Sequence, residues 1–124
     1  MENFINKIIE GNCVEVMRQF DDNVIDLTVT SPPYDDLRNY KGFVFPFEDI
    51  AKELYRVTKE GGVVVWVVND ATINGNETGT SFKQALFFQQ IGFNLHDTMI
   101  FRKANPIPQI YRKRYNNEFS AKVL

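Results

Sequence analysis

The residues best suited to chemistry stand together in the segment Thr30-Ser31-Pro32-Pro33-Tyr34. Ser31 offers a hydroxyl group, Pro32 offers a carbonyl oxygen with no amide hydrogen beside it, and Tyr34 offers a flat ring. The two consecutive prolines exclude both helix and further sheet pairing, so the segment should form a stiff loop. Two oxygen acceptors and an aromatic ring could hold a planar base that carries an amino group.

This loop follows an apolar, β-branched run that is typical of a buried strand, and ligand sites of open α/β sheets lie at the carboxyl ends of strands. The rest of the chain alternates between patterns of strand and helix, which predicts an α/β fold with a mostly parallel sheet, helices on both faces and a last, antiparallel strand. The uninterrupted apolar run 63–68 should be a strand covered on both faces, with Trp66 in the core. Gly61-Gly62 should end the helix before that run. The predicted strands are 5–10, 24–30, 63–68, 93–102 and 118–124, and the predicted helices are 13–20 (capped by Asn12), 46 or 47 to 58, and 80 or 81 to 90.

Composition limits the classes of protein to consider. A chain of 124 residues suits one domain, and no stretch approaches the roughly 18 apolar residues of a membrane span. The N-terminus lacks a signal-peptide pattern, Cys13 is the single cysteine and no metal-ligand cluster surrounds the single His96. We therefore expect a cytoplasmic protein without a metal site.

Positive charge gathers near the C-terminus. Residues 99–124 carry six Lys or Arg against one acidic residue, interleaved with aromatic side chains, whereas the net charge of the whole chain is −2. Basic and aromatic residues together suit a phosphate backbone and unstacked bases. A solvated basic loop is the alternative interpretation.

An ordered series of motifs resembles the amino-group DNA methyltransferases, in the permuted β class whose catalytic half comes first in the chain. A lone Ser-Pro-Pro-Tyr would be a weak signal, but here the likeness extends over nearly the whole sequence. It rests on residues 8–13, 26–38, 54–63, the Trp66 strand, Gly92-Phe93, 102–106 and 114–119.

The resemblance implies a partial Rossmann-like methyltransferase fold and a site-specific enzyme, related to restriction–modification, that methylates cytosine N4 or adenine N6 of DNA. S-adenosylmethionine would be the methyl donor. Ser31 and the carbonyl of Pro32 would hold the amino hydrogens out of the ring plane, in the catalytic motif that Pro33 and Tyr34 complete. Tyr34 would stack on a base flipped out of the duplex. Ser at the first motif position favours cytosine N4, although both bases occur in the family.

Further site residues follow from the same resemblance. Asn12, Cys13 and Thr30 would lie on the donor side, although Cys13 also suits a small buried position. Asn69 and Asp70, which follow the strand 63–68, would line the pocket or belong to a surface loop. Residues that would contact DNA or the target base are Arg38, Asn105, Tyr115 and Phe119, with an ion pair between Arg38 and Asp36 and local packing of the two aromatic rings as the alternatives.

Departures from the family pattern limit these expectations. Asn12 stands where the family often has Asp, and residues 120–124 leave the pattern. None of the seven glycines forms the donor-binding arrangement Asp-Pro-Phe-x-Gly-x-Gly. We therefore expect residues 1–124 to be the catalytic half of a bacterial, archaeal or phage methyltransferase domain, without the donor-binding half and target-recognition region. Such a half would pair with a complementary half-protein or self-associate along the edge of the strand before Ser31. A truncated remnant without turnover and a DNA-binding α/β module are the alternatives.

Overall fold

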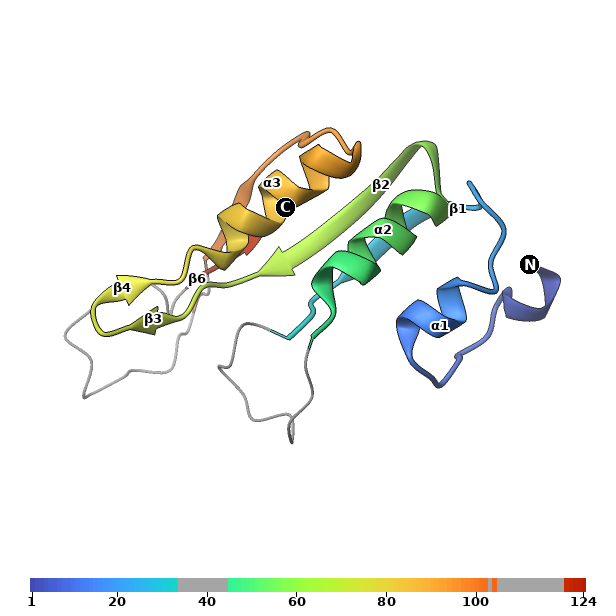
Figure 1. Cartoon of the computed structure of the whole chain (residues 1–124), viewed down its shortest axis with the longest axis horizontal. Helices are drawn as coiled ribbons and strands as arrows, with labels where there is room; N and C mark the ends of the chain where they lie inside the picture. The colour runs from blue at the N-terminus through green and yellow to red at the C-terminus, as the bar shows by residue number, and fades with distance from the viewer. Residues whose placement is uncertain (34–44, 103, 105–119) are drawn as a thin grey trace. The chain divides into compact units, whose positions relative to one another are not determined.

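The computed structural model describes residues 1–33, 45–102, 104 and 120–124 (Figure 1). Helices and strands alternate along these residues, as the sequence predicts for an α/β protein. The elements are η1 (Glu2–Phe4), α1 (Cys13–Met17), β1 (Ile25–Thr30), α2 (Phe47–Val57), β2 (Thr58–Val68), β3 (Thr72–Ile73), β4 (Asn76–Glu77), α3 (Thr80–Ile91), β5 (Met99–Arg102) and β6 (Ser120–Val123).

Four strands form one sheet in the order β1-β2-β6-β5. β1 and β2 run parallel, because helix α2 connects them as a crossover (Figure 1). β6 lies antiparallel to both of its neighbours, with Val123 opposite Val67 of β2 and Met99 of β5. The predicted last, antiparallel strand is therefore confirmed. A separate antiparallel pair, β3 and β4, lies in the segment that was predicted to be a loop.

The chain divides into two compact units, one of residues 1–28 and 46–64 and the other of residues 29–45 and 65–124. In the first unit, helix α2 buries one apolar face, as its helical spacing predicts. Helix α1 packs against α2 and buries Val14. The buried residues of α2 are Ile50, Ala51, Leu54 and Val57.

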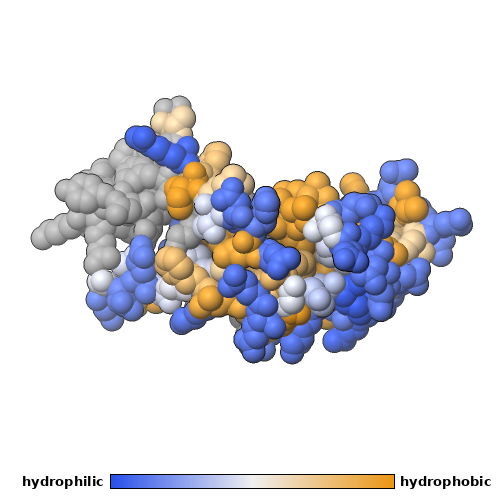
Figure 2. Space-filling model, turned by 90° about the horizontal axis from the view of Figure 1, so that it is seen from above, coloured by the Kyte–Doolittle hydropathy of each residue, from blue (hydrophilic) through white to orange (hydrophobic). Residues whose placement is uncertain are grey.

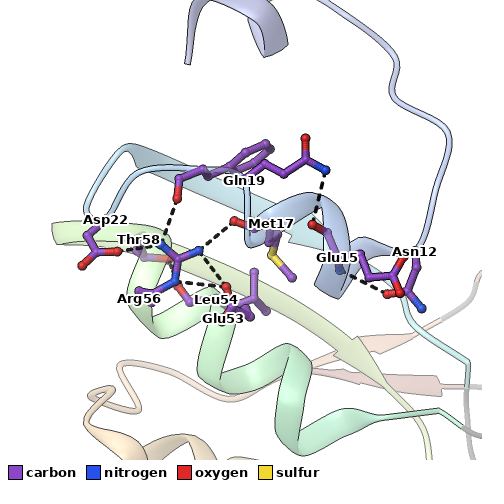
Figure 3. Close-up of polar contacts among 10 residues, drawn as sticks. Asn12, Glu15, Met17, Gln19, Asp22, Glu53, Leu54, Arg56 and Thr58 are labelled. Carbon is purple, nitrogen blue, oxygen red and sulfur yellow. Dashed lines mark hydrogen bonds and ion pairs between the residues drawn. The ribbon is translucent and has the colours of Figure 1, made fainter.

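Arg56 joins α2 to the end of α1 (Figure 3). Its Nη2 donates to the carbonyl oxygen of Met17 at 2.7 Å, and its Nη1 donates to that of Phe20 at 2.9 Å. The same guanidinium forms ion pairs with Asp22 at 2.6 Å and with Glu53 at 2.7 Å. Hydrogen bonds to Glu53 and then to Asp22 raise the pKa of Arg56, so this group stays charged wherever the protein is folded. Arg56 thus satisfies carbonyl groups at a helix end that have no partner within α1.

The glycine pair was placed wrongly by the sequence prediction. Helix α2 ends at Val57, where the Thr58 hydroxyl donates to the carbonyl oxygen of Leu54 at 2.6 Å, and Gly61 and Gly62 lie inside β2. Gly61 adopts a φ of +78°, which favours glycine. A Cβ atom at Gly62 would lie 2.9 Å from the carbonyl oxygen of Lys59, so glycine is needed there for space.

Trp66 anchors the core of the second unit, as predicted, with 1% of its surface exposed. Its Nε1 donates to Oε1 of buried Gln84 at 2.9 Å, and its ring meets Phe88 edge-on at 5.2 Å between centroids. Phe93 continues this aromatic cluster, with its ring centroid 5.5 Å from that of Phe88. The cluster attaches α3 to β2 through one polar and several apolar contacts.

Three other predictions need correction. Residues 5–10 form no strand, because Asn6 has a φ of +58° that breaks an extended backbone. Helix α1 ends at Met17, not Phe20, because the amides of residues 19 and 20 bond three residues back instead of four. The predicted strand 93–102 is limited to its last four residues, β5.

Apolar side chains also reach the surface in many places (Figure 2). The run 63–68 was predicted to be covered on both faces, yet Val63 is exposed. Both faces of β5 are exposed as well. Large exposed apolar side chains also occur on β1 (Leu27, Val29), α3 (Phe82, Leu86) and β3 (Ile73).

Candidate active site

Strand β1 delivers the proline loop to one edge of the sheet. The strand ends at Thr30, as predicted, and Ser31 is the first residue beyond it. Ser31 is exposed to solvent, whereas Pro32 and Pro33 are half-buried. The proline rings therefore rest partly on the protein while the serine is open to solvent, as a residue that binds a ligand must be.

Strand β2 ends at the same edge. Because β1 and β2 are parallel, the loop that starts at Ser31 and the segment that starts at Asn69 both follow carboxyl ends of neighbouring strands. That edge is where open α/β sheets bind their ligands. The described part of the chain thus brings two of the segments singled out in the sequence to one edge.

Asp70 has a structural role there. Its carboxylate is only 4% exposed, with Oδ1 accepting from the amide of Ser81 at 2.7 Å and Oδ2 from the Ser81 hydroxyl at 2.6 Å. Ser81 lies in the first turn of α3, so Asp70 satisfies an amide that has no partner within the helix. Charge also favours a carboxylate at this helix end. Asp70 therefore fixes the start of α3 against the end of β2, and the surface-loop interpretation is wrong for this residue.

Asn12 caps helix α1, as predicted. Its Oδ1 accepts from the amides of Val14 at 3.0 Å and Glu15 at 3.3 Å (Figure 3). Cys13, at the first position of the helix, is exposed, so the interpretation of this residue as a small buried one is wrong. The side-chain oxygen of Asn12 is engaged by the helix, and a donor contact through its side-chain nitrogen stays a prediction.

The other residues named from the sequence lie outside the described part of the chain. These are Tyr34, Arg38, Asn105, Tyr115 and Phe119, together with most of the basic, aromatic segment. Among the described residues, no cluster of His, Cys, Asp and Glu could hold a metal ion. Nor does any helix in the described ranges have the length and apolarity to cross a membrane. Sequence reasoning missed the pairing of Asp70 with Ser81, for which the only local signal was a serine close after Gly79.

Comparisons with known proteins agree with this arrangement. Residues 25–122 match the family model of the N6_N4_Mtase type, described as DNA methylase. The chain is 73% identical over 82 residues to the orphan methyltransferase M.BamHII of Bacillus amyloliquefaciens, a match that covers 66% of this chain and 31% of that protein. It is 31% identical over 141 residues to the type II beta methyltransferase M.BslI of Bacillus sp. (strain NEB-606), covering 97% of this chain and 15% of that protein.

Solved structures show the same fold. A Thermus thermophilus protein, described as a DNA modification methylase and complexed with S-adenosyl-L-methionine, matches with a TM-score of 0.69 and 24% identity. The match covers 91% of this chain and 49% of that one. The cytosine-N4-specific PvuII DNA methyltransferase matches with a TM-score of 0.69 and 19% identity over 91% of this chain and 45% of that one. The chain thus spans about half the length of these structures and under a third of the two curated relatives.

Proposed function

From the premise that this chain belongs to the DNA methylase family, we propose that it is the catalytic half of an S-adenosylmethionine-dependent DNA methyltransferase. The target would be an exocyclic amino group, with cytosine N4 ahead of adenine N6 because serine opens the motif. The observation that carries the proposal is the exposed Ser31 at the carboxyl end of β1, directly before two half-buried prolines.

The chemical task explains this arrangement. An exocyclic amino group on a base is a poor nucleophile, because its lone pair is delocalised into the ring. The Ser31 hydroxyl and the Pro32 carbonyl oxygen accept the two amino hydrogens and draw them out of the ring plane, which localises the lone pair. Tyr34 stacks on the flipped base and holds it in place. Catalysis then rests on orientation, since the stiff loop holds its acceptors before the base arrives.

The donor site is supplied only in part by this chain. S-adenosylmethionine, when bound, supplies a methyl group on a positively charged sulfur. Thr30, at the end of β1, and Asn12 and Cys13, at the start of α1, are our candidates to contact it. The chain's seven glycines include no Asp-Pro-Phe-x-Gly-x-Gly arrangement, so a complementary half would provide the main donor grip.

DNA would be held by residues beyond the sheet edge. Arg38, Asn105, Tyr115 and Phe119 are candidates for the base pocket and the DNA cleft. The excess of cations over acids in residues 99–124 supports contact with phosphates. The same excess supports a second candidate function, DNA binding without turnover, in a chain that lacks its other half.

A methyl-transfer assay with labelled donor tests the proposal. The chain is co-expressed with a donor-binding half and offered duplex DNA, and we expect Ser31→Ala to lower the rate at least about 100-fold, as for removal of one preorganised hydrogen-bonding group. Ser120→Ala, on strand β6, serves as the matched control and should leave the rate unchanged. DNA binding retained without any methyl transfer by the wild-type pair would favour the second candidate. Methyl transfer that survives Ser31→Ala would refute the site assignment.

A further inference from the structure

Strand β1 lies at an open edge of the sheet. It comes first in the strand order, so one side of its backbone has no neighbour among the described strands. An open edge presents a row of amide and carbonyl groups that another strand can pair with, and natural proteins usually protect such edges. Here the open edge belongs to the strand that carries the catalytic loop.

The side chains of β1 are poorly suited to water on one face. Leu27 is 58% exposed and Val29 is 66% exposed, and the alternation of a strand places both on the same face. The opposite face carries Asp26, whose carboxylate is already paired with Lys59 at 2.9 Å. Charged residues that would protect the edge are thus absent from the apolar face of β1, within the described strand Ile25–Thr30.

The comparisons indicate what could cover this surface. The chain aligns with 91% of its own length on methylase structures of which it covers only about half. The half of that fold without a counterpart here must meet the chain at some surface, and the strands β2 and β6 are already paired on both sides. β1 is the edge from which an added strand would end beside Ser31.

We infer that the open edge of β1, with Leu27 and Val29, is the docking surface for the donor-binding half of the methylase fold, which adds a strand to the sheet there. This inference rests on the proposed function, because it assumes that a donor-binding half exists. Addition of a strand parallel to β1 would place that strand's carboxyl end next to the loop at Ser31. The docked half would thereby complete the sheet and bring its donor site to the catalytic serine in one step.

Two other occupants of the surface are outcomes that a test can reveal. A second copy of this chain could pair its own β1 with this one, which would hide the apolar residues without supplying a donor site. Masking by the chain's own segments is a third outcome, and it would leave the lone chain monomeric and unable to bind a donor-binding half.

Co-expression provides the test, because both halves can then fold together. The probe is the part of the Bacillus amyloliquefaciens relative that follows its 82-residue match to this chain. A tag on this chain should retain the probe in equal amounts, without donor or DNA present. We expect the pair of changes Leu27→Lys and Val29→Lys to lower retention at least about tenfold, because docking would bury two unpaired charges.

Ile73→Lys is the matched control, since Ile73 is also an exposed apolar strand residue but lies on β3. It should retain the probe as well as the wild type does. Hydrogen exchange of the co-purified pair gives a second measurement: the amides of Ile25–Thr30 on the open side should become protected. Failure of the wild type to retain the probe, or unchanged retention with unprotected β1 amides, would overturn the inference.

Light scattering of the lone chain separates the remaining outcome. Self-association that the two lysines abolish, without any retention of the probe, would identify a second copy as the occupant. Because no step of this test depends on methyl transfer, a retained but inactive pair would refute the proposed function and leave the docking inference standing.

Discussion

Replacement of Arg56 by methionine should destabilise the protein strongly. The change removes every donor of the side chain but keeps an unbranched apolar stem. Arg56 is 30% exposed, and its Nη atoms hold the carbonyl oxygens of Met17 and Phe20 at 2.7 and 2.9 Å. Both bonds are part-buried and charge-assisted, so each is worth about 1.5 kcal/mol, the lower end of the range for such bonds.

The ion pairs of Arg56 add less. Asp22 is largely exposed, so that pair contributes about 0.5 kcal/mol, and the more buried Glu53 contributes about 1 kcal/mol. The sum is about 4 kcal/mol, a large fraction of the roughly 5–15 kcal/mol that stabilises an ordinary domain. Arg56→Lys keeps the charge but loses the fork, so it should cost about half as much.

Urea denaturation followed by far-UV circular dichroism measures these losses in the free energy of unfolding. Lys59→Met is the matched control, because the pair of Lys59 with Asp26 is exposed on both sides and worth only about 0.5 kcal/mol. The raised pKa of Arg56 means that its stabilisation is present below the usual arginine range and is lost only above that range, so the difference from wild type should not change on the alkaline side of neutrality. A loss for Arg56→Met no larger than that for Lys59→Met would refute the reasoning.

Two further substitutions test the packing of β2. Gly62→Ala should cost about 3 kcal/mol of unfolding free energy, because its Cβ would lie 2.7 Å from the Thr58 side chain and within 3.1 Å of two carbonyl oxygens. Gly61→Ala, with open space but a φ of +78°, should cost about 1 kcal/mol, and the reverse order of the two losses would contradict this assignment. Trp66→Phe should cost about 3 kcal/mol, because it leaves the buried oxygen of Gln84 without its donor, and a double-mutant cycle with Gln84→Leu should recover part of that loss in chemical denaturation. Strict additivity of the two changes would contradict the coupling.

Local signals predicted the elements that position the candidate site. Two prolines stop β1 whatever the rest of the fold does, and the spacing of Ile50, Leu54 and Val57 forces one face of α2 inward. The glycine pair misled the prediction because glycine near a helix end is usually a stop. Gly62 serves another need, the close approach of β2 to the carbonyl oxygen of Ile25, which sequence alone does not reveal.

Long-range polar contacts were the least predictable part. Arg56 reaches back 36 residues to Phe20 and 39 residues to Met17, and nothing in the local pattern of α2 marks it as different from a surface arginine. Asp70 meets Ser81 across 11 residues, so a carboxylate expected to line a pocket or a loop caps a helix. Ser31 was easier to place, since its surroundings are set by its neighbours in sequence. The assignment of Asn12, Cys13 and Thr30 to the donor side stays a prediction.

The single tryptophan gives the protein a built-in optical reporter. Trp66 is almost wholly enclosed, and its indole nitrogen donates to Gln84 in the core of the second unit. Its emission should therefore be blue-shifted in the native state and should move to longer wavelength when that unit opens to water. Because residues 1–28 and 46–64 contain no tryptophan, the emission follows one unit alone, and its comparison with circular dichroism would reveal whether the two units melt together or in turn.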